Sequence, residues 1–266
     1  MKNHQRTNYR LPLLCSITVM ALVATLTPAT AENLQNTKAN VSVNDPRPIE
    51  FAARMLEKAY GWIITYEDPP YENEADVLDV TETVRKDLDK YKPGQAPRVL
   101  IPKGGKFSFE YDVDPLTNRP TDPGVLVQQM LDAYAVAGNP GIFRLDKDTE
   151  RVHIIPAAVR NKDGVMVSRQ SVLDVAIIIP PQKRTGAQLL EAFCAAVSAA
   201  TGTHVGIGMV PINLLVQYKT EAGAKNQNAR DFLAHELDRM TGHPTMTWKL
   251  LYDPGHKIYA LNIDRV

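Results

Sequence analysis

The stretch TMTWKLLYDPGHKIYAL occupies residues 245–261 and decides the fold class that we predict for this chain. Strand-forming residues lie on both sides of Asp253-Pro254-Gly255, an arrangement typical of a β-hairpin whose turn contains Pro and Gly. A helical pattern precedes the hairpin, begins after Asn228 and ends at Gly242. Helix and hairpin together predict an α+β unit in which helices pack on a small sheet.

The residues before this helix complete the unit. A helix after Thr185 is predicted to end at Gly202, a strand over 204–210 to stop at Pro211, and an alternating strand to cover 214–218. The predicted order from residue 185 to the last residue is therefore helix, strand, strand, helix, strand, strand.

The same order recurs earlier in the chain. The order is predicted from five segments and from the Pro and Gly residues that bound them. The segments are a helix over 49–60 after Pro48, strands over 62–66 and 106–111, a helix from Asp122 to Gly138, and a hairpin over 142–156. The acid-rich residues 67–89 lengthen the connection between the first two strands and predict an exposed insertion. We therefore predict an α+β fold made of two similar two-layer units.

These patterns divide the chain into five parts. They are a signal peptide (1–31), a flexible linker (32–47), a first module with the acidic insertion (48–158), a connecting segment with a short apolar strand (159–184) and a second module (185–266).

The first residues have the three-part layout of a secretory signal. Lys2, Arg6 and Arg10 precede an uncharged apolar stretch, and Ala29-Thr30-Ala31 supplies small residues for cleavage before Glu32. An uncleaved N-terminal anchor is the alternative. The layout predicts a periplasmic or secreted protein, whose only cysteine after cleavage, Cys194, lies on the apolar face of a predicted helix and is expected to be buried.

Composition excludes several classes. The whole chain has 30 basic and 30 acidic residues, and removal of the signal leaves three more acids than bases. This balance argues against a nucleic-acid partner, and no apolar run after the signal reaches the roughly 20 residues of a membrane span.

Residues 192–263 carry a resemblance to a known module. Leu190-Glu191-Ala192-Phe193, Gly202-Thr203-His204 and Ala229-Arg230-Asp231-Phe232-Leu233, followed by Gly242 and a closing strand, resemble the short N-terminal domain of bacterial secretins and TonB-dependent receptors. Residues 48–156 resemble a second, more divergent copy. The resemblance implies a tandem pair of such modules, although in those families the chain continues into a pore or barrel domain.

Sequence motifs predict no catalytic, cofactor or metal site. His235-Glu236 lacks the second histidine of a zinc helix, because Arg239 stands at that position. The candidate interaction surface consists of aromatic residues on or beside strands, for which packing against their own helices is the alternative: Trp62, Tyr66, Trp248 and Tyr252.

Export, the doubled pattern and the lack of a catalytic set predict a non-enzymatic protein that binds another envelope protein through strand edges or helix faces. Self-association into an envelope ring is a variant of this prediction. The alternative from another class is an exported hydrolase of cell-wall or nutrient polymer, with acids from residues 67–89 assisted by His153 or His204.

Overall fold

The computed structural model describes residues 37–92 and 94–266, so the predicted signal peptide lies outside the described residues. The first part of the described chain contains β1 (Thr37–Asp45), α1 (Pro48–Tyr60), β2 (Ile63–Glu67), β3 (Val77–Asp79), α2 (Thr81–Val84), β4 (Leu100–Pro102), β5 (Gly105–Val113), α3 (Pro123–Val136), β6 (Ile142–Lys147) and β7 (Arg151–Arg160). The second part contains β8 (Met166–Ser168), β9 (Ala176–Ile179), β10 (Arg184–Thr185), α4 (Gly186–Thr201), β11 (Val205–Ile207), α5 (Ile212–Gln217), β12 (Lys219–Thr220), β13 (Ala224–Asn228), α6 (Ala229–Thr241), β14 (Met246–Asp253) and β15 (Ile258–Arg265).

One mixed sheet runs through both halves of the chain and confirms the α+β class. Its strand order is β11-β15-β14-β2-β7-β6, and β8 pairs with β7 beside that path. In this sheet the two halves of the chain follow the same pattern: β2 is parallel to β7 and β11 is parallel to β15, while β6 and β14 pair antiparallel with β7 and β15, respectively. The predicted units are therefore not separate, because β14 of the second half pairs in parallel with β2 of the first.

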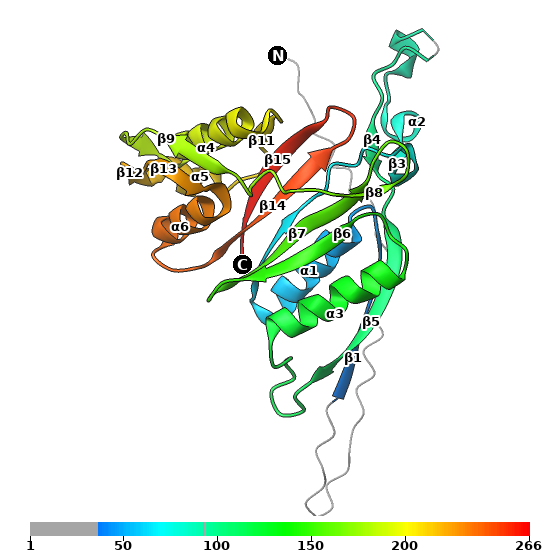
Figure 1. Cartoon of the computed structure of the whole chain (residues 1–266), viewed down its shortest axis with the longest axis horizontal. Coiled ribbons are helices and arrows are strands. Elements are labelled where there is room, and N and C mark those ends of the chain that lie inside the picture. Colours follow the sequence, from blue (N-terminus) through cyan, green and yellow to red (C-terminus); the bar gives the residue numbers. More distant parts are fainter. Residues whose placement is uncertain (1–36, 93) are drawn as a thin grey trace, which may run out of the picture. The chain divides into compact units, whose positions relative to one another are not determined.

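The two halves cover opposite faces of this sheet. Ile64 and Tyr66 of β2 belong to the core formed with α1 and α3, whereas Trp248 and Leu250 of β14 belong to the core formed with α4 and α6. Figure 1 shows α1 and α3 on one side of the sheet and α4 and α6 on the other. Each face of the central strands is thereby covered by helices of one half.

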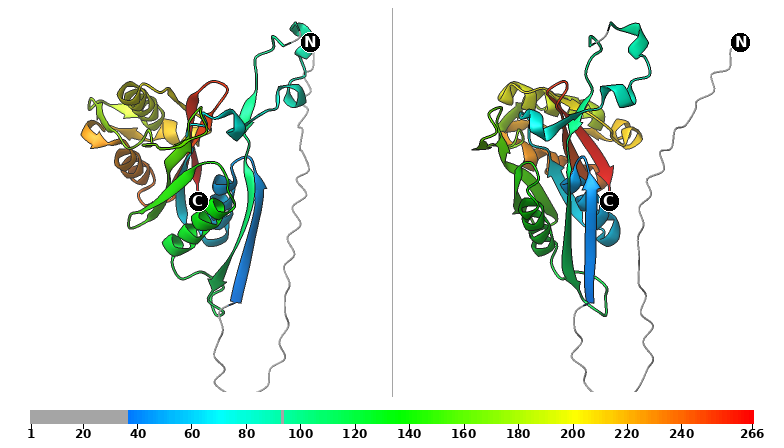
Figure 2. Two further views of the ribbon diagram at one scale, coloured as in Figure 1. Left: turned by 45° about the vertical axis from the view of Figure 1, so that its right-hand side comes forward. Right: turned by 90° about the vertical axis from the view of Figure 1, so that its right-hand side faces the viewer.

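A two-stranded ribbon accompanies each helix pair. β1 pairs with β5 antiparallel over nine residues, and β9 pairs with β13 over a shorter length. α1 contacts both β1 and β2, and α3 contacts both β5 and β6, so these two helices lie between their ribbon and the main sheet. Figure 2 shows the β1–β5 ribbon as a separate layer beyond the helices.

Helix ends follow the local signals in the sequence. Gly61 and Gly202 end α1 and α4 in the left-handed conformation, with φ of 68° and 69°. Asp122 and Asn228 cap α3 and α6 by accepting bonds from the amides two and three residues later. These four predictions are confirmed.

Two predicted segments are wrong. Residues 37–45, assigned to a flexible linker, form β1, whose Val41 and Val43 are buried against α1 and α3. Residues 214–218, predicted to be a strand, belong largely to the short helix α5, where only Leu215 is buried. Leu215 lies under the first turn of α4, where a Cβ added to Gly186 would be 2.9 Å from the Leu215 carbonyl oxygen.

The acid-rich insertion forms an arm built on the β3–β4 hairpin, with α2 between these strands in the sequence. Figure 2 shows this arm projecting from the rest of the described chain. Among residues 37–92 and 94–266, no helix has the length and apolarity to cross a membrane.

Candidate functional site

The prediction of an aromatic surface is wrong for three of its four residues, because they belong to the core. Tyr66, Trp248 and Tyr252 are 1%, 0% and 6% exposed. Trp62 is partly buried, with its ring centroid 4.8 Å from that of Tyr60. Packing against the helices accounts for Tyr66, Trp248 and Tyr252, so these three cannot offer a surface to a partner, whereas Trp62 is partly exposed.

Three acids of the insertion segment are buried in ion pairs. Glu67, Asp68 and Asp76 are each at most 1% exposed. Asp68 accepts bonds from Arg47 Nε at 2.6 Å and from the Tyr252 amide at 2.9 Å. These carboxylates fix the arm and the end of β2 in place. The predicted exposed insertion is therefore exposed only in part, since three of its nine acids are buried and the other six are exposed or partly exposed.

The pairing of β14 with β2, which we call the seam, has a buried ion pair on one face. The seam joins Lys249 and Leu250 to Tyr66 and Glu67. Lys249 is fully buried, and its Nζ lies 2.6 Å from Glu57 Oε1 of α1. Burial lowers the pKa of this lysine, while Glu57 acts in the opposite direction.

The opposite face of the seam has a second ion pair. Arg230 of α6 donates from Nε to Glu67 Oε1 at 2.8 Å and from Nη2 to Oε2 at 3.1 Å. Its Nη1 lies 2.5 Å from Asp174 Oδ1, and the Ser171 hydroxyl also donates to Glu67. On each face of the sheet, therefore, one ion pair joins a residue of the first half to a residue of the second half.

A polar cleft of about 380 Å³ opens beside this second pair. It lies between the start of α6 and the β6–β7 hairpin, and its lining includes His153, Asp148 and Arg230. His153 Nδ1 lies 2.8 Å from Thr65 Oγ1, and Nε2 lies 3.4 Å from Asp148 Oδ2. Hydroxyl, imidazole and carboxylate thus occur in the order found in hydrolytic triads.

This row of groups does not form an accessible nucleophilic site. Thr65 is 0% exposed, so no substrate carbonyl can approach its hydroxyl. Both oxygens of Glu67 are occupied by Arg230, and the exposed His204 lies beside β11, away from the cleft. Of the groups that the hydrolase prediction requires, the cleft therefore contains one imidazole, that of His153, and no free carboxylate from the insertion.

His153 is expected to make stability depend on pH. Burial lowers its pKa below the ordinary value of 6.5, although Asp148 opposes this. At a pH between the pKa of His153 in the folded chain and its pKa in the unfolded chain, the unfolded chain binds one more proton than the folded chain. The contribution of His153 to the free energy of unfolding is therefore complete above about pH 6.5. Below this pH it falls, with a slope of up to about 1.4 kcal/mol per pH unit. Urea unfolding from pH 7.5 to 5 should show this slope in the native chain and lose it in His153→Gln.

The matched control for that series is His235→Gln. The His235 side chain is 64% exposed, so its substitution should leave the slope of the native chain unchanged. Equal slopes for the native chain and His153→Gln would show that the buried imidazole does not control this dependence.

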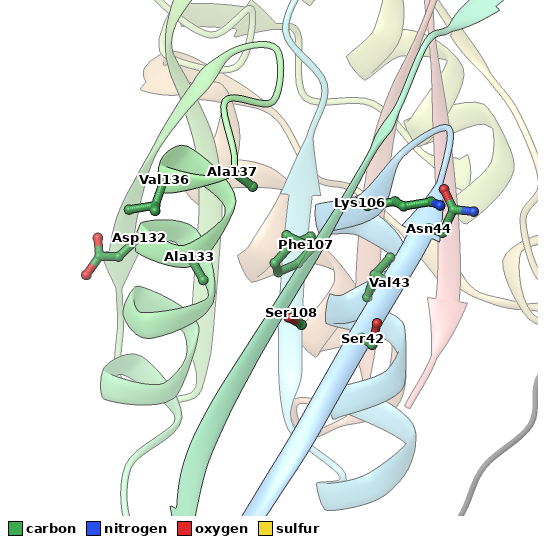
Figure 3. A pocket seen from close by; sticks show the side chains of 10 residues that line it. All are labelled: Ser42, Val43, Asn44, Lys106, Phe107, Ser108, Asp132, Ala133, Val136 and Ala137. Carbon is green, nitrogen blue, oxygen red and sulfur yellow. The ribbon is translucent and has the colours of Figure 1, made fainter.

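A groove with a volume of about 760 Å³ lies between β5 and α3 (Figure 3). It is lined by Ser42, Val43 and Asn44 of β1, by Lys106, Phe107 and Ser108 of β5, and by Asp132, Ala133, Val136 and Ala137 at the end of α3. Val136 is 89% exposed, although it is apolar. In the described chain, β5 has no strand partner besides β1.

The free edge of β5 directs main-chain groups into this groove. Asn139 Nδ2, just after α3, donates to the Lys106 carbonyl oxygen at 3.3 Å, so that carbonyl points away from β1. Directions alternate along an antiparallel strand, so the N–H and C=O of Ser108 point the same way. An exposed edge of this kind can accept another strand.

The prediction that Cys194 is buried is confirmed. Cys194 is 4% exposed, and burial raises the pKa of its thiol to about 12, so it is no nucleophile at neutral pH. His235, from the incomplete zinc motif, is exposed on α6.

Within the described ranges, no group of three or more His, Cys, Asp or Glu side chains is placed to hold a metal ion.

Comparison with known proteins finds no counterpart for this chain: no family model, curated protein or solved structure matches it.

Proposed function

We propose that this chain is an exported, non-enzymatic protein of the cell envelope that binds an extended segment of another envelope protein along the free edge of β5. The observation that carries the proposal is the unpaired β5 edge beside the groove under α3. A strand added there would take its main-chain hydrogen bonds from Ser108 and lay alternate side chains against Phe107 and Val136.

Two further features support the proposal. Each half has a helix ending in glycine before a strand, a second strand before the second helix, and a closing hairpin, which is the layout expected from the resemblance to secretin and TonB-dependent modules. The buried charges described above are engaged with one another, which suits a structural role.

Site-specific photo-crosslinking in the envelope tests the proposal. A photoreactive residue at Ser108 is expected to give one reproducible crosslinked protein, whereas the same residue at Lys225, on the shorter ribbon of the second half, should not. Ser108→Pro in a chain that carries the probe at Ser42, another residue of the groove, should abolish the product because it removes the edge N–H. Ser108→Thr is the matched control and should retain it.

The same product from Lys225 as from Ser42, or a product that persists in a folded Ser108→Pro variant, would reject the β5 edge as the binding surface. Folding of each variant is checked by circular dichroism before the crosslinks are compared.

A further inference from the structure

A second pocket, far along the chain from the β5 groove, has an unusual excess of hydrogen-bond donors. It has a volume of about 460 Å³ and lies where β10, β12 and the first turn of α4 meet. Its lining consists of Lys183, Arg184, Thr185, Gln188, Lys219, Thr220 and Glu221. Three of these side chains are cationic and one is acidic.

None of the three cations has a carboxylate partner among the described residues. Arg184 is held by neutral oxygens only, with Nη1 2.9 Å from the Pro180 carbonyl and Nη2 3.0 Å from Gln182 Oε1. The exposed Lys183 and Lys219 make no ion pair within the described ranges. With Glu221 included, the pocket lining keeps a net charge of +2, and its cations are unpaired, in contrast to the paired charges at the seam.

The neutral side chains of the pocket also have unused hydrogen-bond donors. The Thr185 hydroxyl oxygen accepts a hydrogen bond from the backbone N–H of Gln188 at 3.3 Å, and Gln188 Oε1 accepts one from the backbone N–H of Thr185 at 2.9 Å. This capping box uses the oxygens of both side chains and leaves the Thr185 O–H and the Gln188 NH₂ free to donate. The positive end of the 16-residue helix α4 lies at the same place.

Thr220 supplies an independent observation. It is 9% exposed, it lines the pocket, and its hydroxyl is buried without a hydrogen-bond partner in the described chain. Buried hydroxyls normally have a partner, and an acceptor at the pocket would give this one its bond.

The frame around these groups is firmly held. Thr220 is paired with Arg184 and Lys219 with Thr185 in the β10–β12 ladder. The Gly186 amide donates to the Tyr218 carbonyl at 2.9 Å, which fixes the start of α4 on the chain that follows α5. The donors are thus positioned before any ligand arrives.

We infer that this pocket binds a phosphate group. A phosphate offers several oxygen acceptors and negative charge, which match two lysines, a helix N-terminus and unused hydroxyl and amide donors. The inference does not depend on the β5 edge.

The phosphate can belong to a soluble anion or to a lipid headgroup. Exposed apolar side chains lie on the neighbouring α5, with Ile212 and Val216 at 52% and 47% exposure, and these could enter the surface of a bilayer. The experiment therefore has one arm for each source.

In the first arm, inorganic phosphate is titrated into the purified protein and followed by NMR. Shifts are expected at the amides of Thr185, Gln188 and Thr220. Lys219→Gln should weaken binding about tenfold through loss of a charge-assisted bond, and Thr220→Val about threefold through loss of a neutral one. Lys225→Gln, an exposed lysine on β13 outside the pocket, is the control and should bind like the native chain.

In the second arm, the same variants are sedimented with vesicles of phosphatidylglycerol and phosphatidylcholine, and with phosphatidylcholine vesicles alone. Binding to anionic vesicles that falls in Lys219→Gln assigns the site to a lipid headgroup. Phosphate binding without vesicle binding assigns it to a soluble phosphate. Failure of both probes, or binding that is equal in Lys219→Gln and Lys225→Gln, would overturn the inference.

Discussion

Replacing Lys249 by methionine is expected to lower the free energy of unfolding by about 3–5 kcal/mol, because it leaves a buried carboxylate without its counter-charge. Glu57 is 8% exposed and receives the Lys249 ammonium at 2.6 Å. Methionine fills much of the lysine volume, so the loss reports the missing charge and not a cavity. Urea denaturation at constant pH, followed by circular dichroism, measures the effect.

A second substitution separates charge from packing. Adding Glu57→Gln to Lys249→Met removes the unpaired charge and keeps an acceptor for the Ile64 amide, which Glu57 bonds at 3.2 Å. The double variant should regain most of the lost stability. The exposed pair Lys38–Glu110 is the control, and Lys38→Met should change stability by about 1 kcal/mol at most. An equal loss in single and double variants would contradict this account of the pair.

On the other face of the sheet, Arg230→Met is expected to cost a similar amount, about 3–5 kcal/mol. The substitution removes two bonds to Glu67, which is 0% exposed and would keep only the Ser171 hydroxyl. The substitution affects Asp174 less, because Arg144 Nη2 still lies 3.0 Å from Asp174 Oδ2. The measurement is again urea denaturation.

The rescue partner here is Glu67→Gln, which removes the buried charge but retains an acceptor for Ser171. Arg98→Met is the control, since Arg98 and Asp79 are 65% and 39% exposed and their pair should contribute little. A loss below about 1 kcal/mol in Arg230→Met would show that Glu67 is stabilised without the guanidinium.

Local signals in the sequence predicted most of the elements. Helix ends at Gly61 and Gly202 depend on a backbone conformation that glycine adopts readily, so they are visible without any knowledge of the fold. β1 was missed because its short Val41 and Val43 alternation lies among asparagines typical of a loop. α5 was missed because its apolar run Leu214-Leu215-Val216 is also typical of a short strand, and packing under α4 decides the outcome.

The site was less predictable, because its contacts join distant parts of the chain. Glu67 and Arg230 are 163 residues apart, and Lys249 and Glu57 are 192 apart. Composition alone makes Glu67 look like one more acid of an exposed insertion. The aromatic residues failed for the same reason, since only the shared sheet shows that helices cover Tyr66 and Trp248 from opposite faces.

The shared sheet also sets the order in which the polypeptide can finish folding. β2 is complete once residue 67 has been synthesised, yet the strand beside it on one edge, β14, does not begin until residue 246. Such high contact order slows folding and keeps a hydrogen-bonding edge open for most of the time that the chain is being made. We therefore expect a chaperone that binds the nascent protein to cover the open edge of β2.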